Sequence, residues 1–263
     1  MPAVSCALLS LETARRGVSS GAANAALVLA GVALLSMVAS TTPTVFVTSV
    51  AVTLGAGIVL GALLRRTGNL AFAFQAAVLL ALLLVAALSL LGSPSSTLIA
   101  AALKEFADLL REGGTPNEEV EAFIARSGVM LLAGAVFLQL IGALLLSYWW
   151  VTLVRGELTF GAEFRQLTVG RALGAILTLL LLLGLVFAAP LVQNLAPLAL
   201  LAFMLQGLAV LSAAAHAQGW RTAVLVPVYV VAALLAVFVA LPLCLLGLVD
   251  NWFDLRSRLR PRS

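Results

Sequence analysis

Long apolar stretches alternate with short polar breaks along most of the chain. The apolar runs cover residues 22–40, 44–64, 70–91, 128–153, 171–190, 196–215 and 222–248. About 20 apolar residues are enough to cross the hydrocarbon core of a bilayer as a helix. Only helices are expected, because an isolated strand or loop would leave backbone groups unpaired in lipid. The pattern therefore predicts an all-α, polytopic transmembrane bundle with about seven spans and a partial N-terminal one.

The stretch from 172 to 249 is the most apolar part of the chain. Its one charged side chain is Arg221. A soluble domain carries about 25% charged residues and does not leave so little surface to face water. A soluble fold is therefore excluded, and the lipid bilayer is the first partner that the sequence predicts.

The ends of some segments are less regular. Residues 1–14 form an apolar segment that is too short to span alone. Residues 190–197, bounded by two prolines, are expected to form a tight polar hairpin. The last run, 222–248, would be about 40 Å long as a helix, which is too long for one upright span and too short for two. Pro227 and Pro242 would bend or break it.

The one large polar insertion, residues 93–126, has its own helical pattern. Apolar residues recur at helical spacing up to Gly113 and Gly114. Thr115 and Pro116 then give a new helix start, with Thr as the cap and Pro at the first helical position. We expect two amphipathic helices. They form either a solvated helical hairpin or a lid over the mouth of the bundle.

Overall composition agrees with a membrane protein. Of the 263 residues, 63% are hydrophobic and 10% charged, and no polar linker divides the chain, so residues 1–263 are expected to form a single membrane domain. Lys104 is the only lysine, and this arginine bias with the Ala and Leu excess favours a bacterial inner-membrane protein. The net charge of +4 reflects cytoplasmic arginines. No basic patch with interleaved aromatics suggests nucleic acid.

The placement of arginine predicts an orientation. The arginine pairs at 15–16 and 65–66 are expected in the cytoplasm, with residues 154–171. The 93–126 insertion holds three basic and six acidic residues and is expected outside. Seven simple spans would then place the basic C-terminal tail, 250–263, outside as well. That contradicts its arginines, and the sequence leaves this conflict open.

Polar groups inside the apolar runs are few, and they are the candidates for ligand contact. Gln139 and Gln206 would contact a ligand or would hydrogen-bond between helices. Gly207, which follows Gln206, is a further candidate for ligand contact and would allow close approach of a backbone. His216 is the only histidine and is expected at a helix end, without partners for a metal.

Signals for catalysis are absent from the sequence. No Asp or Glu lies between residues 13 and 104 or between 164 and 249, which argues against a relay of buried carboxylates. No phosphate-binding glycine loop, zinc-protease motif or serine-hydrolase motif occurs. We therefore expect no enzymatic activity, no cofactor and no metal site.

Two short stretches near the ends of the apolar region are candidates for contact with a partner or with lipid. One contains Glu163, Phe164 and Arg165. The other is the tail, where Asp250, Asp254 and Arg258 follow one another at one-turn spacing, with Arg256 between them. Such i,i+4 neighbours predict a continuous helix that leaves the membrane.

These stretches resemble the YybS-like family of predicted bacterial membrane proteins, whose function is unknown. The matching pieces are residues 63–67, 163–165, 205–208, 247–250 and 254–256, and their order and spacing hold over almost the whole chain. The family is distantly similar to the substrate-binding S components of energy-coupling-factor transporters. The resemblance implies a helical bundle with a small-molecule pocket. It also implies a further span upstream, so that residues 3–17 would be the end of the second family span.

Two functions are consistent with these observations. The first is a small-molecule binding or transport-related bundle, which lacks an ATP-binding motif and would need an ATPase or another membrane partner for pumping. The second is a non-transporting scaffold that docks a cytoplasmic or envelope partner, or anionic lipid, through its arginine-rich loop and tail.

Overall fold

The fold was analysed in a computed structural model, which describes residues 2–38, 43–91, 103–104, 107–108, 111–112, 117–157, 159–187, 189–220 and 236–259. These residues form helices, with no strand among them. The helices are α1 (Pro2–Arg16), α2 (Val18–Val38), α3 (Pro43–Thr67), α4 (Leu70–Leu91), α6 (Asn117–Arg155), α7 (Phe160–Arg165), α8 (Arg171–Val186), α9 (Pro190–Ala217), α11 (Ala236–Phe253) and α12 (Leu255–Leu259). The all-α prediction is confirmed.

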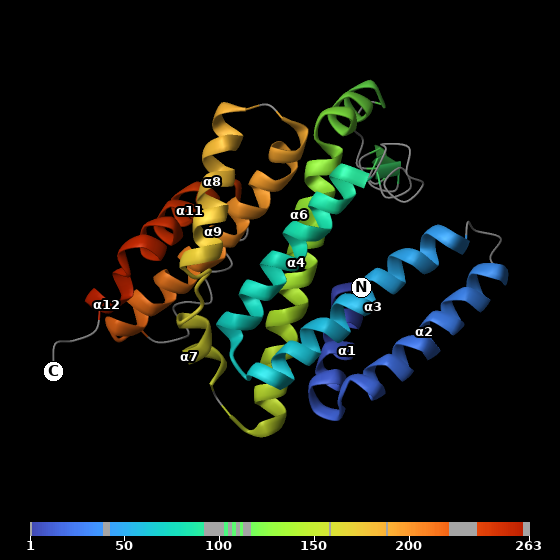
Figure 1. Cartoon of the computed structure of the whole chain (residues 1–263), viewed down its shortest axis with the longest axis horizontal. Helices are drawn as coiled ribbons and strands as arrows, with labels where there is room; N and C mark the ends of the chain where they lie inside the picture. The colour runs from blue at the N-terminus through green and yellow to red at the C-terminus, as the bar shows by residue number, and fades with distance from the viewer. Residues whose placement is uncertain are drawn as a thin grey trace.

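The helices are arranged in two groups around a central pair. α4 and α6 lie in the middle, with α1, α2 and α3 on one side and α8, α9, α11 and α12 on the other (Figure 1). Among the described residues, the largest fully buried side chains are three phenylalanines: Phe74 of α4, Phe137 of α6 and Phe203 of α9. The core is therefore formed where α4, α6 and α9 meet.

Three helices in the described part of the chain are long and apolar enough to cross a membrane. Their spanning regions are Leu70–Ala87, Ser127–Arg155 and Pro190–Ala217. Shorter apolar helices cover Val18–Leu34, Arg171–Val186 and Phe238–Phe253. These helices overlap predicted spans, although several of their bounds differ, and their exposed leucines suit a surface that faces lipid.

The short N-terminal segment is packed deep in the bundle. α1 contacts α2, α3 and α6, and a Cβ added at Gly61 of α3 would lie 2.4 Å from the carbonyl oxygen of Ser10. The small residue at this position lets the backbones of α1 and α3 approach closely. On the opposite side of α1, the Ser10 hydroxyl donates to Ser147 Oγ of α6 at 3.2 Å.

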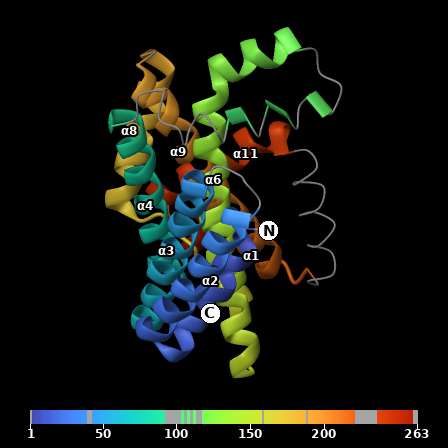
Figure 2. The same ribbon diagram turned by 90° about the vertical axis from the view of Figure 1, so that its right-hand side faces the viewer.

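The second predicted amphipathic helix is not a separate element. α6 begins at Asn117 and continues without a break to Arg155, and the predicted start residues Thr115 and Pro116 lie outside the described part of the chain. Its first turns lean away from the rest of the bundle (Figure 2). Arg111, which precedes them, donates to Asp108 at 3.0 Å and to Glu121 of α6 at 3.4 Å. Most of the first predicted helix lies outside the described residues.

The predicted polar hairpin at 190–197 is wrong. Pro190 is the first residue of α9, and Pro197 lies inside this helix. A proline is favourable at the first helical position, because its missing N–H has no helical partner there. The polar residues serve the neighbouring helices instead. Gln193 donates to the carbonyl oxygens of Gly184 and Phe187 at the end of α8, and Asn194 donates to Ser89 of α4.

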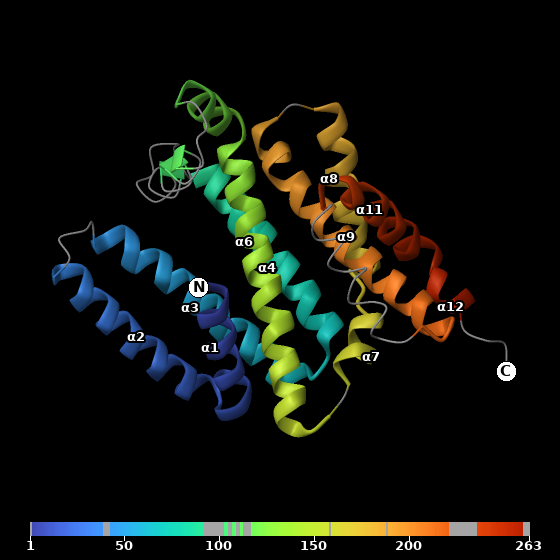
Figure 3. The same ribbon diagram turned by 180° about the vertical axis from the view of Figure 1, so that it is seen from behind.

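The last apolar run also differs from its predicted bounds. Residues 221–235 lie outside the described part of the chain. The helix described there, α11, starts at Ala236 and runs past 248 to Phe253, with Pro242 inside it. It packs against α9 more extensively than against any other helix, as the view from behind shows (Figure 3).

Candidate functional site

A buried polar cluster joins α9, α11 and the segment before α8. Gln206 is fully buried, and its side-chain oxygen accepts a hydrogen bond from the backbone N–H of Val169 at 2.9 Å. Its side-chain nitrogen donates to Asp250 Oδ2, also at 2.9 Å. Both ends of the Gln206 amide are thus engaged by the protein. We call Val169, Gln206, Asp250 and Arg256 the Asp250 cluster.

Arg256 completes this cluster from the tail. Asp250 is 3% exposed, and the Arg256 guanidinium donates to its carboxylate at 2.6 Å from Nη2 and 3.1 Å from Nε. Nη1 of the same guanidinium donates to the carbonyl oxygen of Arg165 at 2.8 Å. A charge this deeply buried requires such a partner, and the arrangement holds the tail against the end of α7.

The predicted continuous helix through the tail is wrong. α11 ends at Phe253, and Asp254 has φ 47°, a left-handed backbone conformation that interrupts the helix before α12. Asp250 forms its ion pair with Arg256, six residues on and beyond this interruption. Asp254 and Arg258 are both exposed.

Gly207 lies at the closest contact between α9 and α11. A Cβ added there would lie 1.9 Å from the carbonyl oxygen of Leu243, and one added at Gly247 would lie 2.0 Å from that of Phe203. Only glycine at both positions lets the two backbones approach this closely. The predicted close backbone approach at Gly207 is confirmed, and it is an approach of protein backbone.

The remaining predicted residues lie around this cluster or apart from it. Phe164 stacks on Phe160, with ring centroids 6.1 Å apart, and Glu163 and Arg165 are half-buried on the same short helix, α7. Gln139 is half-buried on α6 and is not part of the Asp250 cluster. The structure thus brings Gln206, Asp250 and Arg256 together with the Arg165 backbone. Their contacts explain how α7, α9, α11 and α12 are joined.

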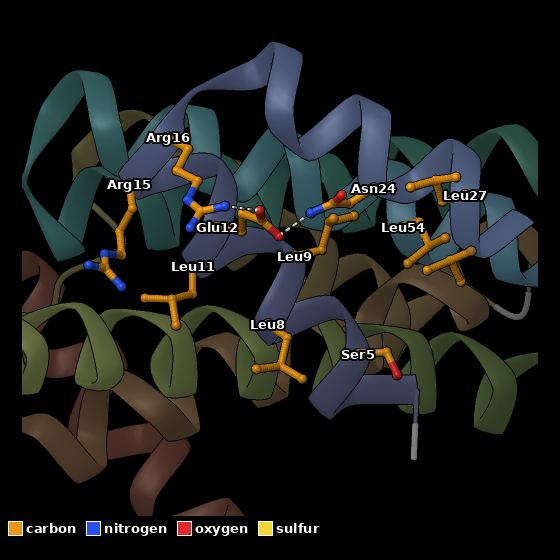
Figure 4. Close-up of a pocket in the computed structure, with 11 residues that line it drawn as sticks. Ser5, Leu8, Leu9, Leu11, Glu12, Arg15, Arg16, Asn24, Leu27 and Leu54 are labelled. Carbon is orange, nitrogen blue, oxygen red and sulfur yellow. Dashed lines mark hydrogen bonds and ion pairs between the residues drawn. The ribbon is translucent and has the colours of Figure 1, made fainter.

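A groove of about 680 Å³ opens on the other side of the molecule, along the hairpin of α1 and α2. Its volume lies in the range of small-molecule sites, roughly 300–1,000 Å³. Apolar side chains line most of it, and charged and amide side chains line the rest (Figure 4). The lining residues are Ser5, Leu8, Leu9, Leu11, Glu12, Arg15, Arg16, Asn24, Leu27, Val28 and Leu54.

The local fold explains how this groove forms. Gly17 separates the two helices and has φ +106°, a conformation that L side chains rarely adopt. The chain can therefore reverse sharply between α1 and α2. Glu12 then reaches across to α2, where its carboxylate accepts hydrogen bonds from Ser20 at 3.3 Å and from Asn24. On its own helix it pairs with Arg16 at 3.5 Å.

The sequence alone did not indicate this groove. Glu12 is the carboxylate just before the stretch without Asp or Glu that begins at residue 13, and Asn24 is a single amide in an apolar run. Their separation of 12 positions gives no helical signal, because they face each other from two helices across a turn. The pattern that indicates such a contact is a carboxylate and an amide on either side of an expected tight turn.

The described residues show no constellation for metal chemistry. Nowhere among them do three His, Cys, Asp or Glu side chains gather as a metal ion would require. Cys6 of α1 and Cys244 of α11 are free thiols, and both are buried. His216 is exposed at the last turn of α9, as predicted for a helix end.

Comparisons of the chain with protein-family models, with curated proteins and with solved structures found no match.

Proposed function

We propose that this protein is a multi-pass bacterial inner-membrane protein that binds an amphiphilic small molecule, in a transport-related role like that of the S components. The observation that supports the proposal is the groove between α1 and α2. It combines apolar walls, such as Leu8 and Leu27, with a charged end at Glu12 and Arg15. A few placed polar groups in a mainly apolar concavity are typical of ligand sites.

The proposal places the ligand away from Gln206. Its amide is engaged at both ends within the Asp250 cluster, so a ligand would have to break protein hydrogen bonds to reach it. A ligand can enter the groove without breaking these hydrogen bonds. Any uphill transport would depend on an energised membrane partner such as an ATPase.

The proposed topology places the 93–126 insertion outside and the C-terminal tail in the cytoplasm, which requires an even number of crossings between Arg171 and Asp250. The contact between Arg256 and the carbonyl oxygen of Arg165 supports the tail assignment, because it holds the tail beside α7. The arginines of residues 154–171 favour a cytoplasmic position for α7. The tail would then share that side, in agreement with its own basic residues.

Occupancy of the groove can be measured by native mass spectrometry of the protein purified in a mild detergent. We expect a bound small molecule on the wild-type chain and at least a fivefold loss of occupancy in Leu27→Trp, because the indole would fill the groove. Leu34→Trp is the matched control, since Leu34 lies on the same helix and is similarly exposed, 66% against 71%. Equal occupancy in the two variants, or no bound species at all, would refute the proposal.

A second candidate function is a scaffold that docks a cytoplasmic partner. It is favoured by the way Arg256 binds α7 and the tail into one surface, beside which Arg258 is exposed. Its test is Arg258→Glu, which reverses a surface charge and leaves the Asp250 cluster intact. Unchanged recovery of co-purifying proteins from this variant would exclude a role for that surface charge.

A further inference from the structure

The groove between α1 and α2 changes in polarity along its length. Its charged residues, Glu12, Arg15 and Arg16, lie close to the turn at Gly17, where α1 ends. Its exposed apolar residues lie further along the hairpin, at Leu8 of α1 and at Leu27 and Val28 of α2. From residue 8 to residue 16 a helix rises about 12 Å. The groove thus has one charged end and one apolar end.

The charge at the polar end is unevenly satisfied. Glu12 already has partners, because Arg16, Ser20 and Asn24 all donate to its carboxylate. Arg15 is exposed and makes no ion pair or hydrogen bond with any other described residue. Arg16 is 75% exposed, and its contact with Glu12 is a long one. Two guanidinium groups against one engaged carboxylate leave this end positive, and so complementary to an anion.

The position of this end suits a lipid headgroup. Arginines at the end of a membrane helix are expected at the level of the headgroups, on the cytoplasmic side. Anionic lipids are concentrated in that leaflet, and each basic residue near its surface contributes about 1 kcal/mol of attraction. The apolar walls extend from there toward the membrane interior, in the direction that an acyl chain takes.

We propose, building on the small-molecule function above, that the occupant of the groove is a membrane lipid with an anionic phosphate headgroup. Arg15 and Arg16 bind the phosphate, and one acyl chain lies along Leu8, Leu27 and Val28. Glu12 and Asn24 hold α1 and α2 at the spacing that admits one chain. A zwitterionic lipid is disfavoured, because its ammonium group would have to compete with the three donors on Glu12.

The test compares two lipids that differ only in the headgroup. The full chain is reconstituted in nanodiscs that contain phosphatidylglycerol and phosphatidylcholine with identical acyl chains, and the lipids retained after release are counted by native mass spectrometry. We expect the wild-type protein to retain phosphatidylglycerol preferentially. Arg15→Gln should reduce this preference about fivefold, which corresponds to the loss of about 1 kcal/mol. Leu27→Trp should reduce the retention of both lipids.

Arg66→Gln is the matched control. Arg66 is an exposed arginine at the end of α3 and does not line the groove, so its loss should leave the preference unchanged. An equal effect of Arg66→Gln and Arg15→Gln would mean that the attraction belongs to the whole basic surface, and this result would overturn the proposal. Displacement of the lipid by excess glycerol phosphate would also overturn it, because the site would then recognise a soluble phosphate.

The proposed function and this inference fail in different ways. Equal retention of the two lipids in wild-type and Arg15→Gln protein, with loss in Leu27→Trp, would overturn the anionic headgroup and keep the groove as a binding site. Retention that is insensitive to Leu27→Trp would remove both.

Discussion

At the scale of single residues, the chain keeps one carboxylate almost fully buried at the end of an apolar helix. Asp250 is tolerated there because Arg256 and Gln206 supply donors to it. Burying a charge is costly unless it is paired and hydrogen-bonded. The residues at both ends of this network come from segments far apart in sequence, so the cluster fastens the tail to the bundle.

Removal of the arginine should therefore destabilise the protein strongly. Arg256→Ala leaves the Asp250 carboxylate buried without its cation, and we expect a loss of about 3 kcal/mol in the free energy of unfolding. Thermal unfolding in detergent, followed by the exposure of buried thiols, measures this. Arg258→Ala is the control, because an exposed arginine should change stability by less than about 0.5 kcal/mol.

The double variant Asp250→Asn/Arg256→Gln separates the cost of an unpaired buried charge from the contribution of the ion pair itself. It removes both charges and keeps amide groups for hydrogen bonding, so it should be more stable than Arg256→Ala alone. If it were less stable, the ion pair itself would be the main source of stability, against the expectation that an unpaired buried charge is the larger penalty.

At the scale of helices, α9 and α11 depend on two glycines where their backbones meet. Gly207→Ala or Gly247→Ala would place a methyl group about 2 Å from a backbone carbonyl oxygen of the other helix. We expect each to cost about 2 kcal/mol or more, because the overpacked helices must separate. The shift in unfolding temperature of the purified protein measures the effect.

Gly142→Ala on α6 is the matched control for these variants. Apart from the adjoining backbone of α6 itself, nothing lies within 4 Å of a Cβ built at this glycine, and alanine favours helix by about 1 kcal/mol over glycine. Its unfolding temperature should stay the same or rise slightly. A drop as large as that of Gly247→Ala would show that helix propensity, and not the close contact, determines the result.

The sequence was informative about helices and poor about their faces. Apolar runs located the three described helices that are long and apolar enough to cross a membrane, because length and hydrophobicity alone define such a helix. They did not show which side of each helix is inside, since lipid and the core are equally apolar. Leu9 is 6% exposed and Leu27 is 71% exposed, yet both are leucines in apolar helices. For this reason the groove was missed.

The predicted roles of the polar residues in the apolar runs are correct only in part. Gln206 was expected to form either a ligand contact or an interhelical hydrogen bond, and in the structure it bonds to Asp250 of α11. Gln193 was read as part of a turn, although its side chain completes the C-terminal end of α8 from the first turn of α9. Local composition cannot distinguish these cases, because the partner carbonyls belong to another helix.

At the scale of the whole molecule, the contact between the tail and α7 constrains the topology. Arg256 and Arg165 lie in direct contact, so the two segments should be found on one side of the membrane. An even number of crossings must then separate Arg171 from Asp250. The three apolar runs after Arg171 give an odd number if each of them crosses once, so they do not satisfy this condition.

Labelling of single cysteines tests this arrangement. In a background of Cys6→Ala and Cys244→Ala, Gln166→Cys and Ser257→Cys should both be protected from an impermeant maleimide in spheroplasts and both be labelled after lysis. Glu118→Cys, in the acidic insertion, should be labelled without lysis. Opposite accessibility of the first two positions would contradict the shared side.

The bond between Ser10 and Ser147 also constrains the order of assembly. The two hydroxyls are 137 positions apart, so α1 leaves the ribosome long before α6 exists. α2 and α3 can pack onto the nascent α1 early, because they follow it directly. The face that carries Ser10 must wait in lipid or against the insertion machinery until α6 arrives. Biogenesis of this protein therefore includes a stage at which α1 has packed against α2 and α3 but not yet against α6, and the synthesis of α6 ends that stage.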